Sequence, residues 1–261
     1  MSAKRYVVVG GGMAGTTAAE TIRARDPEAD ITLLSEEAHP LYSRVRLPSY
    51  AAGELPREKV MMRSAEDYKA KNIRFLSSER VVALDSARKE IQTASGKAIP
   101  YDKALIASGG RPASWLALDS EAQKRSFRLQ TINDAERLRD FFAAHPAGRA
   151  LVAGGGFIAL ELAELFHKRN FIVTLLMREK QFWDGRWERP EDTLRLARMW
   201  DTNGIAVNYG ETVISAERTP DGVRVRTSAG NAYEADCVAA GIGIERNLGF
   251  LQAEATENGA L

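Results

Sequence analysis

Apolar residues along the chain fall into short runs that alternate with longer segments of mixed polarity. The run RYVVVG at 5–10 ends in glycine and predicts a strand buried on both faces. A helix is expected over 14–25, and the run DITLLS at 30–35 predicts the next strand. A second block with the same order extends from RALVAGGG to FIVTLLMR, over 149–178. Each block therefore predicts a strand–helix–strand unit of about 30 residues.

Alternating apolar and polar residues follow each block and predict antiparallel strands. In the first half they occupy 79–108, with a turn at Ser95-Gly96, and end in a buried strand at 103–108. Before them the pattern predicts a loop at 39–56 with three prolines, a short helix at 66–72 and a strand at 73–77.

The second half repeats this arrangement after a crossover at 110–116. Helices are expected at 131–145, capped by Asn133 or Asp134, and at 191–204, stopped by Gly204. Four strands are expected at 206–210, 212–219, 222–228 and 231–241. The predicted fold class is α/β, with two Rossmann-like domains, each a central parallel sheet with helices and an antiparallel excursion.

Composition narrows the function classes. A length of 261 residues indicates about two domains, and a formal net charge of +1 gives no basic surface for nucleic acid. No run approaches the roughly 20 apolar residues of a membrane span, and the N-terminus does not resemble a signal peptide. The single cysteine, Cys237, excludes an intrachain disulfide, which favours the cytoplasm. The three histidines have no metal-ligand spacing.

The first glycine turn has the spacing of a dinucleotide-binding motif. Gly10, Gly12 and Gly15 form G-x-G-x-x-G between the predicted strand and helix. The first glycine permits the tight turn, the second lets a pyrophosphate approach the backbone, and the third lets helix and strand pack closely. Glu36 follows the next strand, where an acidic residue binds ribose hydroxyls.

The second glycine turn carries the variant G-x-G-x-x-A, at Gly154, Gly156 and Ala159. The strand that follows ends in basic residues, Arg178 and Lys180, which suit the 2′-phosphate of NADPH. Glu179 lies between them and would suit the free 2′-hydroxyl of NADH, so both cofactors stay open.

The motifs together resemble those of the two-dinucleotide-binding-domain flavoproteins, the pyridine nucleotide-disulfide oxidoreductase family. The resemblance is strongest to its rubredoxin reductase, apoptosis-inducing factor and nitrite reductase branch. It covers nearly the whole chain and rests on these segments: VVVGGGMAG, ITLLSEE, LYSRVRLPSYAAGE, YDKALIASGGRP, GGGFIALELAELF and ADCVAAGIGIERN.

The resemblance implies an FAD-binding domain at 1–112, an inserted NAD(P)-binding domain at 113–238 and a return to the first domain at 239–261. It implies FAD contacts from Gly10, Gly12, Met13, Ala14, Gly15, Glu36, Arg44, Val82, Ala107, Ser108, Gly109 and Arg111. It implies NAD(P)H contacts from Gly154, Gly156, Phe157, Ile158, Glu161, Arg178 and Lys180, and further cofactor contacts from Gly241 and Gly243 on the return segment. Phe157 would lie between flavin and nicotinamide, and Glu161 near the carboxamide, as the catalytic pair.

The family's redox cysteines have no counterpart after Glu36. The resemblance therefore implies an FAD-dependent NAD(P)H oxidoreductase that passes electrons to a rubredoxin, ferredoxin or nitrite reductase acceptor without a redox disulfide. Members of the family continue into a Gly-Asp strand and an interface domain, so a truncated member is expected here. A slow-turnover, redox-responsive FAD/NAD-binding protein and an inactive fragment stay open as alternatives, and the oligomeric state is not predicted.

Overall fold

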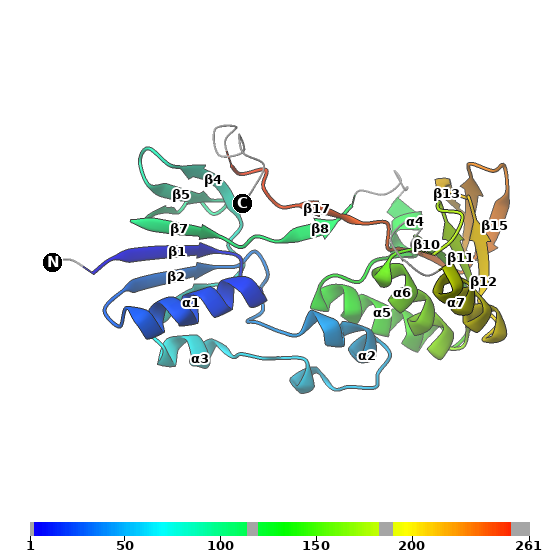
Figure 1. The fold of residues 1–261 in the computed structure, drawn as a ribbon, viewed down its shortest axis with the longest axis horizontal. Helices are drawn as coiled ribbons and strands as arrows, with labels where there is room; N and C mark the ends of the chain where they lie inside the picture. Colours follow the sequence, from blue (N-terminus) through cyan, green and yellow to red (C-terminus); the bar gives the residue numbers. More distant parts are fainter. Residues whose placement is uncertain (1–2, 114–119, 183–189, 252–261) are drawn as a thin grey trace. The chain divides into compact units, whose positions relative to one another are not determined.

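The computed structural model describes residues 3–113, 120–182 and 190–251. The chain forms two compact units, each built on a parallel sheet of its own (Figure 1). The first unit comprises Met1–Ser43, Arg57–Arg111 and Glu245–Leu261, and the second comprises Arg44–Pro56 and Pro112–Ile244.

Four parallel strands form the sheet of the first unit, in the order β3-β2-β1-β7. Val7, Val8 and Val9 are all buried, as a central strand covered on both faces requires. Val9 pairs with Leu34 on one side and Ile106 on the other, so three strands end at one edge. The strands are β1 (Arg5–Val9), β2 (Asp30–Leu34), β3 (Ile73–Leu76) and β7 (Lys103–Ile106).

Helices cover one face of this sheet and an antiparallel meander covers the other. Val8 and Leu33 pack with Ala19 and Tyr68 of the helices, whereas Val7, Val9 and Leu34 pack with the meander. The helices on this face are α1 (Met13–Arg25) and α3 (Ala65–Ala70), and the unit also contains the 3₁₀ turn η2 (Arg57–Lys59). The meander consists of β4 (Val81–Asp85), β5 (Glu90–Thr93) and β6 (Ala98–Pro100).

The second unit repeats this layering on five parallel strands, in the order β12-β11-β10-β16-β9. The strands are β9 (Ser126–Phe127), β10 (Gly148–Ala153), β11 (Phe171–Met177), β12 (Ala206–Tyr209) and β16 (Cys237–Ala240). The helices are α4 (Ser120–Lys124), α5 (Ile132–Ala144), α6 (Phe157–Lys168) and α7 (Pro190–Thr202). The meander consists of β13 (Val213–Arg218), β14 (Val223–Thr227) and β15 (Ala232–Ala235).

Phenylalanine rings fill the helical side of the second unit. Phe142 and Phe166, from α5 and α6, are fully buried with their ring centroids 5.3 Å apart. Phe171 of β11 lies within 5.7 Å of both rings. The opposite face of the sheet packs on the meander through Leu151 and Val225. The α/β class and the two parallel sheets with antiparallel excursions are therefore confirmed.

Residues 44–56, predicted as a loop, instead form the 3₁₀ turn η1 (Arg44–Arg46) and the helix α2 (Leu47–Ala51). Pro48 is compatible with this helix because it stands in the first turn, where its missing N–H has no intrahelical partner. The helix lies on α5 and α6, and Arg139 donates from Nη1 to the carbonyl of Tyr50 at 2.7 Å. Tertiary contact with the rest of the second unit thus orders a segment whose prolines predicted a loop.

Two boundaries differ from the predictions. Helix α5 is capped by Thr131, whose hydroxyl accepts from the N–H of Asp134 while the Asp134 carboxylate accepts from the N–H of Thr131. The single strand expected at 231–241 is two strands, β15 and β16, in different sheets. The chain changes sheet at Asp236 without glycine or proline, so the pattern gave no sign of the break.

Short elements join the two units. β8 (Gly110–Pro112) and β17 (Ile244–Arg246) pair with each other where the chain passes from one unit to the next. The crossover predicted at 110–116 lies partly outside the described residues. Over the ranges that the structure covers, no helix combines the length and the hydrophobicity needed to cross a bilayer.

Candidate functional site

The first glycine turn joins the end of β1 to the start of α1. Gly10 has φ +117°, and its N–H donates to the carbonyl oxygen of Leu34 at 2.8 Å. A Cβ on Gly10 would stand 2.1 Å from the carbonyl oxygen of Ala107, so the fold itself requires glycine here. A Cβ on Gly12, in contrast, would meet no atom within 4 Å. The backbone at Gly12 is therefore open to the approach of a ligand.

Gly12 is also the N-cap of α1, and its end of the helix has neither a side-chain cap nor an acidic residue in the first turn. Free N–H groups and the helix dipole at such an end favour an anion. Gly15 keeps the helix against the strand, because a Cβ there would lie 1.8 Å from the carbonyl oxygen of Gly10. Met13 and Ala14, between these glycines, are exposed. The first glycine turn therefore combines backbone N–H groups open to an anion, at Gly12, with close packing of helix on strand, at Gly15.

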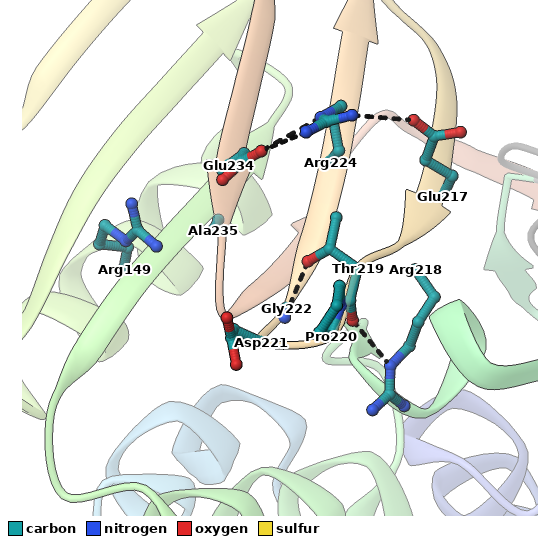
Figure 2. A pocket seen from close by; sticks show the side chains of 10 residues that line it. All are labelled: Arg149, Glu217, Arg218, Thr219, Pro220, Asp221, Gly222, Arg224, Glu234 and Ala235. Carbon is teal, nitrogen blue, oxygen red and sulfur yellow. Dashed lines mark hydrogen bonds and ion pairs between the residues drawn. The ribbon is translucent and has the colours of Figure 1, made fainter.

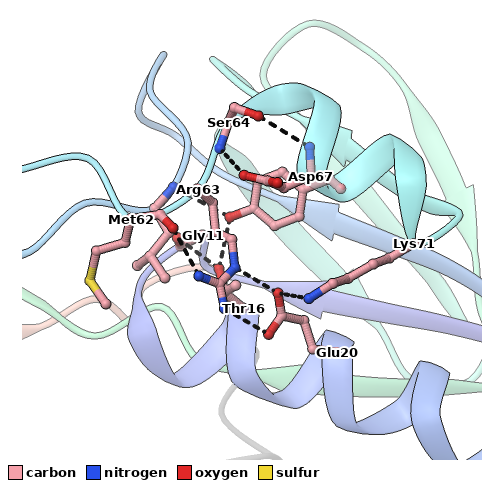
Figure 3. Close-up of polar contacts among 10 residues, drawn as sticks. Gly11, Thr16, Glu20, Met62, Arg63, Ser64, Asp67 and Lys71 are labelled. Carbon is pink, nitrogen blue, oxygen red and sulfur yellow. Dashed lines mark hydrogen bonds and ion pairs between the residues drawn. The ribbon is translucent and has the colours of Figure 1, made fainter. Parts of the chain in front are cut away.

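Polar contacts fix α1 to the segment 62–71 (Figure 3). The Glu20 carboxylate accepts from the Arg63 guanidinium at 2.8 and 3.1 Å and from Nζ of Lys71 at 2.7 Å. The hydrogen bond from Arg63, helped by Lys71, outweighs the opposite effect of burial and lowers the pKa of Glu20 to about 2. The helix that presents the first glycine turn is thereby held by charge as well as by packing.

Replacement of Glu20 by Gln should lower the free energy of unfolding by about 1–2 kcal/mol at pH 7, because the ion pairs are only partly shielded from solvent. The pKa of Glu20 is lower in the folded than in the unfolded chain. Its contribution is therefore complete above about pH 4.5 and disappears as the pH falls towards 2.

Urea unfolding at pH 7 and at about pH 3 measures this difference. Glu28→Gln, at an exposed carboxylate in the turn between α1 and β2, serves as the control and should change stability at neither pH. A destabilisation by Glu20→Gln that stays constant on acidification would contradict the assignment.

The predicted acidic residue and strand end lie beyond the carboxyl ends of β2 and β7. Glu36 is exposed, and its Oε1 lies 3.9 Å from Nε of Arg80. The segment 107–109 directly follows β7. The Ser108 hydroxyl donates to the carbonyl of Asn247 at 2.7 Å, and the Asn247 amide donates to the carbonyl of Ser108 at 3.1 Å. This strand end is therefore fixed by a segment more than a hundred residues away.

Three further predicted residues lie elsewhere, and two of them have polar contacts of their own. Arg111 forms an ion pair with Glu245 at 3.1 Å. Val82 is exposed at a bulge in the pairing of β4 with β5. The Arg44 guanidinium donates to the carbonyl of Gln130, and Arg44 belongs to the second unit. The roles of these residues toward a flavin nucleotide stay predictions.

The second glycine turn repeats the geometry of the first, between β10 and α6. Gly154 has φ +124°, and a Cβ on Gly156, the N-cap of α6, would meet no atom within 4 Å. Ala159 stands where the first turn has its third glycine. Gly241 leaves room for it, because a Cβ on Gly241 would lie 2.4 Å from the backbone nitrogen of Ala159. Gly243, two residues further on, has φ +121°.

The start of α6 presents an aromatic ring and a carboxyl group. Phe157 is 68% exposed and its neighbour Ile158 is 38% exposed. Burial, with the neighbouring Glu164 as a second cause, raises the pKa of Glu161. The two predicted catalytic residues therefore share the first two turns of one helix, beside the open backbone at Gly156.

Arg178 occupies in the second unit the position that Glu36 has in the first. The carbonyl of Leu34 accepts the N–H of Gly10 at 2.8 Å, and the carbonyl of Leu176 accepts the N–H of Gly154 at 2.9 Å. Glu36 and Arg178 each follow two residues after these leucines. The turn after β2 therefore carries an acidic residue, and the turn after β11 carries a basic residue. The exchange favours a negatively charged group on the ribose at the second turn.

Glu179 opposes this simple reading. Its Oε1 lies 2.9 Å from Nη2 of Arg178, and its Oε2 lies 3.5 Å from the place of a Cβ on Gly155. The carboxylate thus reaches back to the glycine turn, while the side chain of Arg178 is 78% exposed. Lys180 is exposed beside them. A cation and a carboxylate both stand where the ribose would be recognised.

The second unit has a polar hollow of about 450 Å³. Figure 2 shows the side chains that line it. Two of its arginines form ion pairs, Arg224 with Glu234 at 2.6 Å and Arg218 with Glu121 at 3.2 Å. Arg149 places the hollow at the amino end of β10. Ligands of parallel sheets bind beyond the carboxyl ends of the strands, where the glycine turn lies. The hollow is therefore not part of the candidate site.

Cys237 is fully buried in β16. Burial raises the pKa of its thiol well above the ordinary value, with Asp236 as a second cause. A thiol held neutral in an apolar strand is not a redox nucleophile. The prediction that Cys237 serves as a small hydrophobic residue is confirmed.

Known proteins resemble this chain in sequence and in fold. A family model described as "Pyridine nucleotide-disulphide oxidoreductase" matches residues 4–260. Putidaredoxin reductase of Pseudomonas putida is 31% identical over 253 residues, 95% of this chain and 59% of that protein. The ferredoxin–NAD(+) reductase component of the biphenyl dioxygenase system of Paraburkholderia xenovorans is 32% identical over 247 residues, 91% of this chain and 57% of that protein.

The crystal structure of the covalent putidaredoxin reductase–putidaredoxin complex matches with a TM-score of 0.88 and 30% identity. The match covers 98% of this chain and 62% of the reductase chain. The chain thus spans about three fifths of the length of these relatives.

Proposed function

Because the chain belongs to the pyridine nucleotide-disulphide oxidoreductase family, we propose that it is an FAD-dependent NAD(P)H oxidoreductase that passes electrons to a small redox protein. The observation that carries the proposal is the pair of glycine turns, each with an open backbone at an uncapped helix end. Relatives named as reductases of putidaredoxin and ferredoxin favour an iron–sulfur or rubredoxin-type acceptor. A nitrite reductase partner is the second acceptor class.

The residues present fit the two cofactors. The first turn would hold the FAD diphosphate at the N-terminus of α1, with Glu36 at a ribose, and the second would hold NAD(P)H at α6. When bound, FAD accepts hydride from the nicotinamide and releases its electrons singly, while the protein supplies binding and orientation. Phe157 would present its exposed ring to a planar group, and Glu161 would accept a hydrogen bond from the carboxamide.

The buried thiol of Cys237 supports electron transfer from the flavin without a protein disulfide. It also supports a cytoplasmic location, because a chain with one cysteine needs no oxidising compartment.

Anaerobic titration tests the proposed function. The chain is reconstituted with FAD, and NADPH or NADH is added while flavin absorbance is recorded. Bleaching of the flavin band, followed by reoxidation on addition of a ferredoxin-type protein, is expected. A bound flavin that both nicotinamides leave oxidised would overturn the proposal, and reduction without reoxidation by any protein acceptor would overturn its second half.

Arg178→Glu should weaken the binding of NADPH by about 10-fold or more and that of NADH much less. The physical reason is the loss of a charge-assisted contact of about 1.5–3 kcal/mol to the 2′-phosphate. Steady-state KM values for both nucleotides measure the effect. Arg226→Glu, an equal charge reversal on β14, is the matched control. An equal loss for both nucleotides would show that Arg178 does not read the 2′-phosphate.

A further inference from the structure

A buried glutamate follows β12 in the second unit. Glu211 is 8% exposed, and its carboxylate accepts from the hydroxyl of Thr227 at 2.6 Å, the amide of Asn231 at 2.9 Å and the hydroxyl of Tyr233 at 2.9 Å. Burial alone would raise the pKa of Glu211, but these three hydrogen bonds outweigh it and lower the pKa. The carboxylate is therefore held ionised and immobile against the turn between β14 and β15.

The backbone of this glutamate holds a second turn, the one after β11. The N–H of Glu211 donates to the carbonyl of Met177 at 2.8 Å. The N–H of Gly210, which has φ +72°, donates to the carbonyl of Glu179 at 3.2 Å. Arg178 lies between these two carbonyls. Residues 210–211 thus set the backbone of the turn at which the ribose of the nicotinamide cofactor would be recognised.

The first unit contains the same arrangement. Glu79 is 5% exposed, and its carboxylate accepts from Ser95 at 3.0 Å and lies 2.6 Å from Nζ of Lys97. Its N–H donates to the carbonyl of Ser35 at 2.8 Å, next to Glu36.

The preceding residue repeats as well. Ser78 has φ +57°, and its N–H donates to the carbonyl of Glu37 at 3.1 Å, as Gly210 does to Glu179. The meander turns that receive the two carboxylates share a sequence pattern, TASGK at 93–97 and TSAGN at 227–231. Each turn closes by a hydrogen bond from the N–H of its threonine to the carbonyl of its last residue, at 3.0 Å in both.

Removing a carboxylate from water is costly, and an apolar side chain would fill either position without that cost. Both glutamates lie at the same place in their units. Each is between the meander and the turn that follows the second strand, which we call the ribose turn (residues 35–37 and 177–179). A buried charge that ties the ribose turn to the meander in both units indicates a role in holding that turn rigid.

We propose that Glu211 is a positioning residue for the nicotinamide cofactor and Glu79 its counterpart for FAD. Each glutamate anchors the turn that recognises the adenosine ribose of its own unit's cofactor. The inference rests on the proposed function and adds two residues that touch neither cofactor.

The test compares the effect of each glutamate variant on the binding of both cofactors. Dissociation constants for FAD and for NADPH are measured by flavin fluorescence and by calorimetry for the wild-type chain, Glu211→Ala and Glu79→Ala. Misplacement of a recognition turn by a fraction of an ångström should weaken binding about 10-fold. We expect Glu211→Ala to weaken only NADPH and Glu79→Ala to weaken only FAD, with less than a twofold change in the other constant.

Two further variants keep the test decisive. Glu211→Gln and Glu79→Gln retain the side-chain volume and one acceptor oxygen, so they should show a smaller loss of the same selectivity even where an Ala variant does not fold. Glu217→Ala, at an exposed carboxylate on β13, should change neither constant. If the wild type binds both cofactors and the variants lose both equally or neither, the inference is wrong while the proposed function stands. A wild type that binds neither cofactor overturns both.

Discussion

A Gly12→Val variant should fold like the wild-type chain and bind FAD at least about 100-fold more weakly. A Cβ at Gly12 meets no protein atom within 4 Å, and its φ of −75° is accessible to valine. The isopropyl group would fill the space through which a pyrophosphate reaches the backbone. Two lost charge-assisted hydrogen bonds, each about 1.5–3 kcal/mol, are enough for this loss of affinity.

Flavin absorbance after gel filtration and a thermal melt followed by circular dichroism measure the two halves of this result. Gly156→Val is the matched variant in the second turn, where a Cβ likewise meets nothing within 4 Å. It should retain FAD and lose NAD(P)H. A Gly12→Val protein that purifies with its flavin bound would show that the first turn is not the FAD cradle.

Gly15→Ala should have the opposite character and lower the stability of the first unit by about 3 kcal/mol or more. The new Cβ would stand 1.8 Å from the carbonyl oxygen of Gly10 and 3.3 Å from Cγ1 of Val8. A backbone oxygen cannot rotate away as a side chain does, so α1 must move off the sheet. That movement would open the packing of Val8 and Ala19 beneath the helix.

Urea unfolding followed by circular dichroism measures the loss, with Gly12→Ala as the control. The control adds the same methyl group in the same turn but into open space, so only the modest preference of an N-cap for glycine over alanine is lost. Equal stabilities for Gly15→Ala and Gly12→Ala would show that the close approach of helix to strand is not required.

The Gly12 and Gly15 variants distinguish two roles of glycine within one motif. By spacing alone, Gly12 and Gly15 belong to one pattern. The structure divides them into a position kept open for a ligand and a position kept small for packing. The same division applies to Gly156 and Ala159, where Gly241 takes over part of the packing role.

Most elements were predictable because their signals are local. Consecutive apolar residues such as Val7, Val8 and Val9 indicate a strand buried on both faces, and Gly204 ends a helix by its own φ of +74°. The errors fall where a distant contact decides. The helix α2 exists because Tyr50 meets Arg139, 89 residues later, and the break at Asp236 exists because two sheets meet there.

The candidate site shows the same limit. Glu79 and Glu211 were not predicted as functional residues. Their partners lie in turns of the meander, and no helical or strand periodicity in the sequence identifies a buried carboxylate of this kind. The repeated pattern of TASGK and TSAGN was the available signal, and it lies outside the glycine motifs. The orientation of Glu179 toward Gly155 likewise depends on a fold that brings residues 24 positions apart together.

The sequence by itself determined that this protein has two glycine turns on two α/β units and one cysteine, since strand periodicity, glycine spacing and composition are properties of neighbouring residues. Only the tertiary structure decided which glycines face open space, which carboxylates are buried and which turns they hold. Those properties depend on atoms such as the carbonyl of Ala107 beside Gly10, which the chain brings together only on folding.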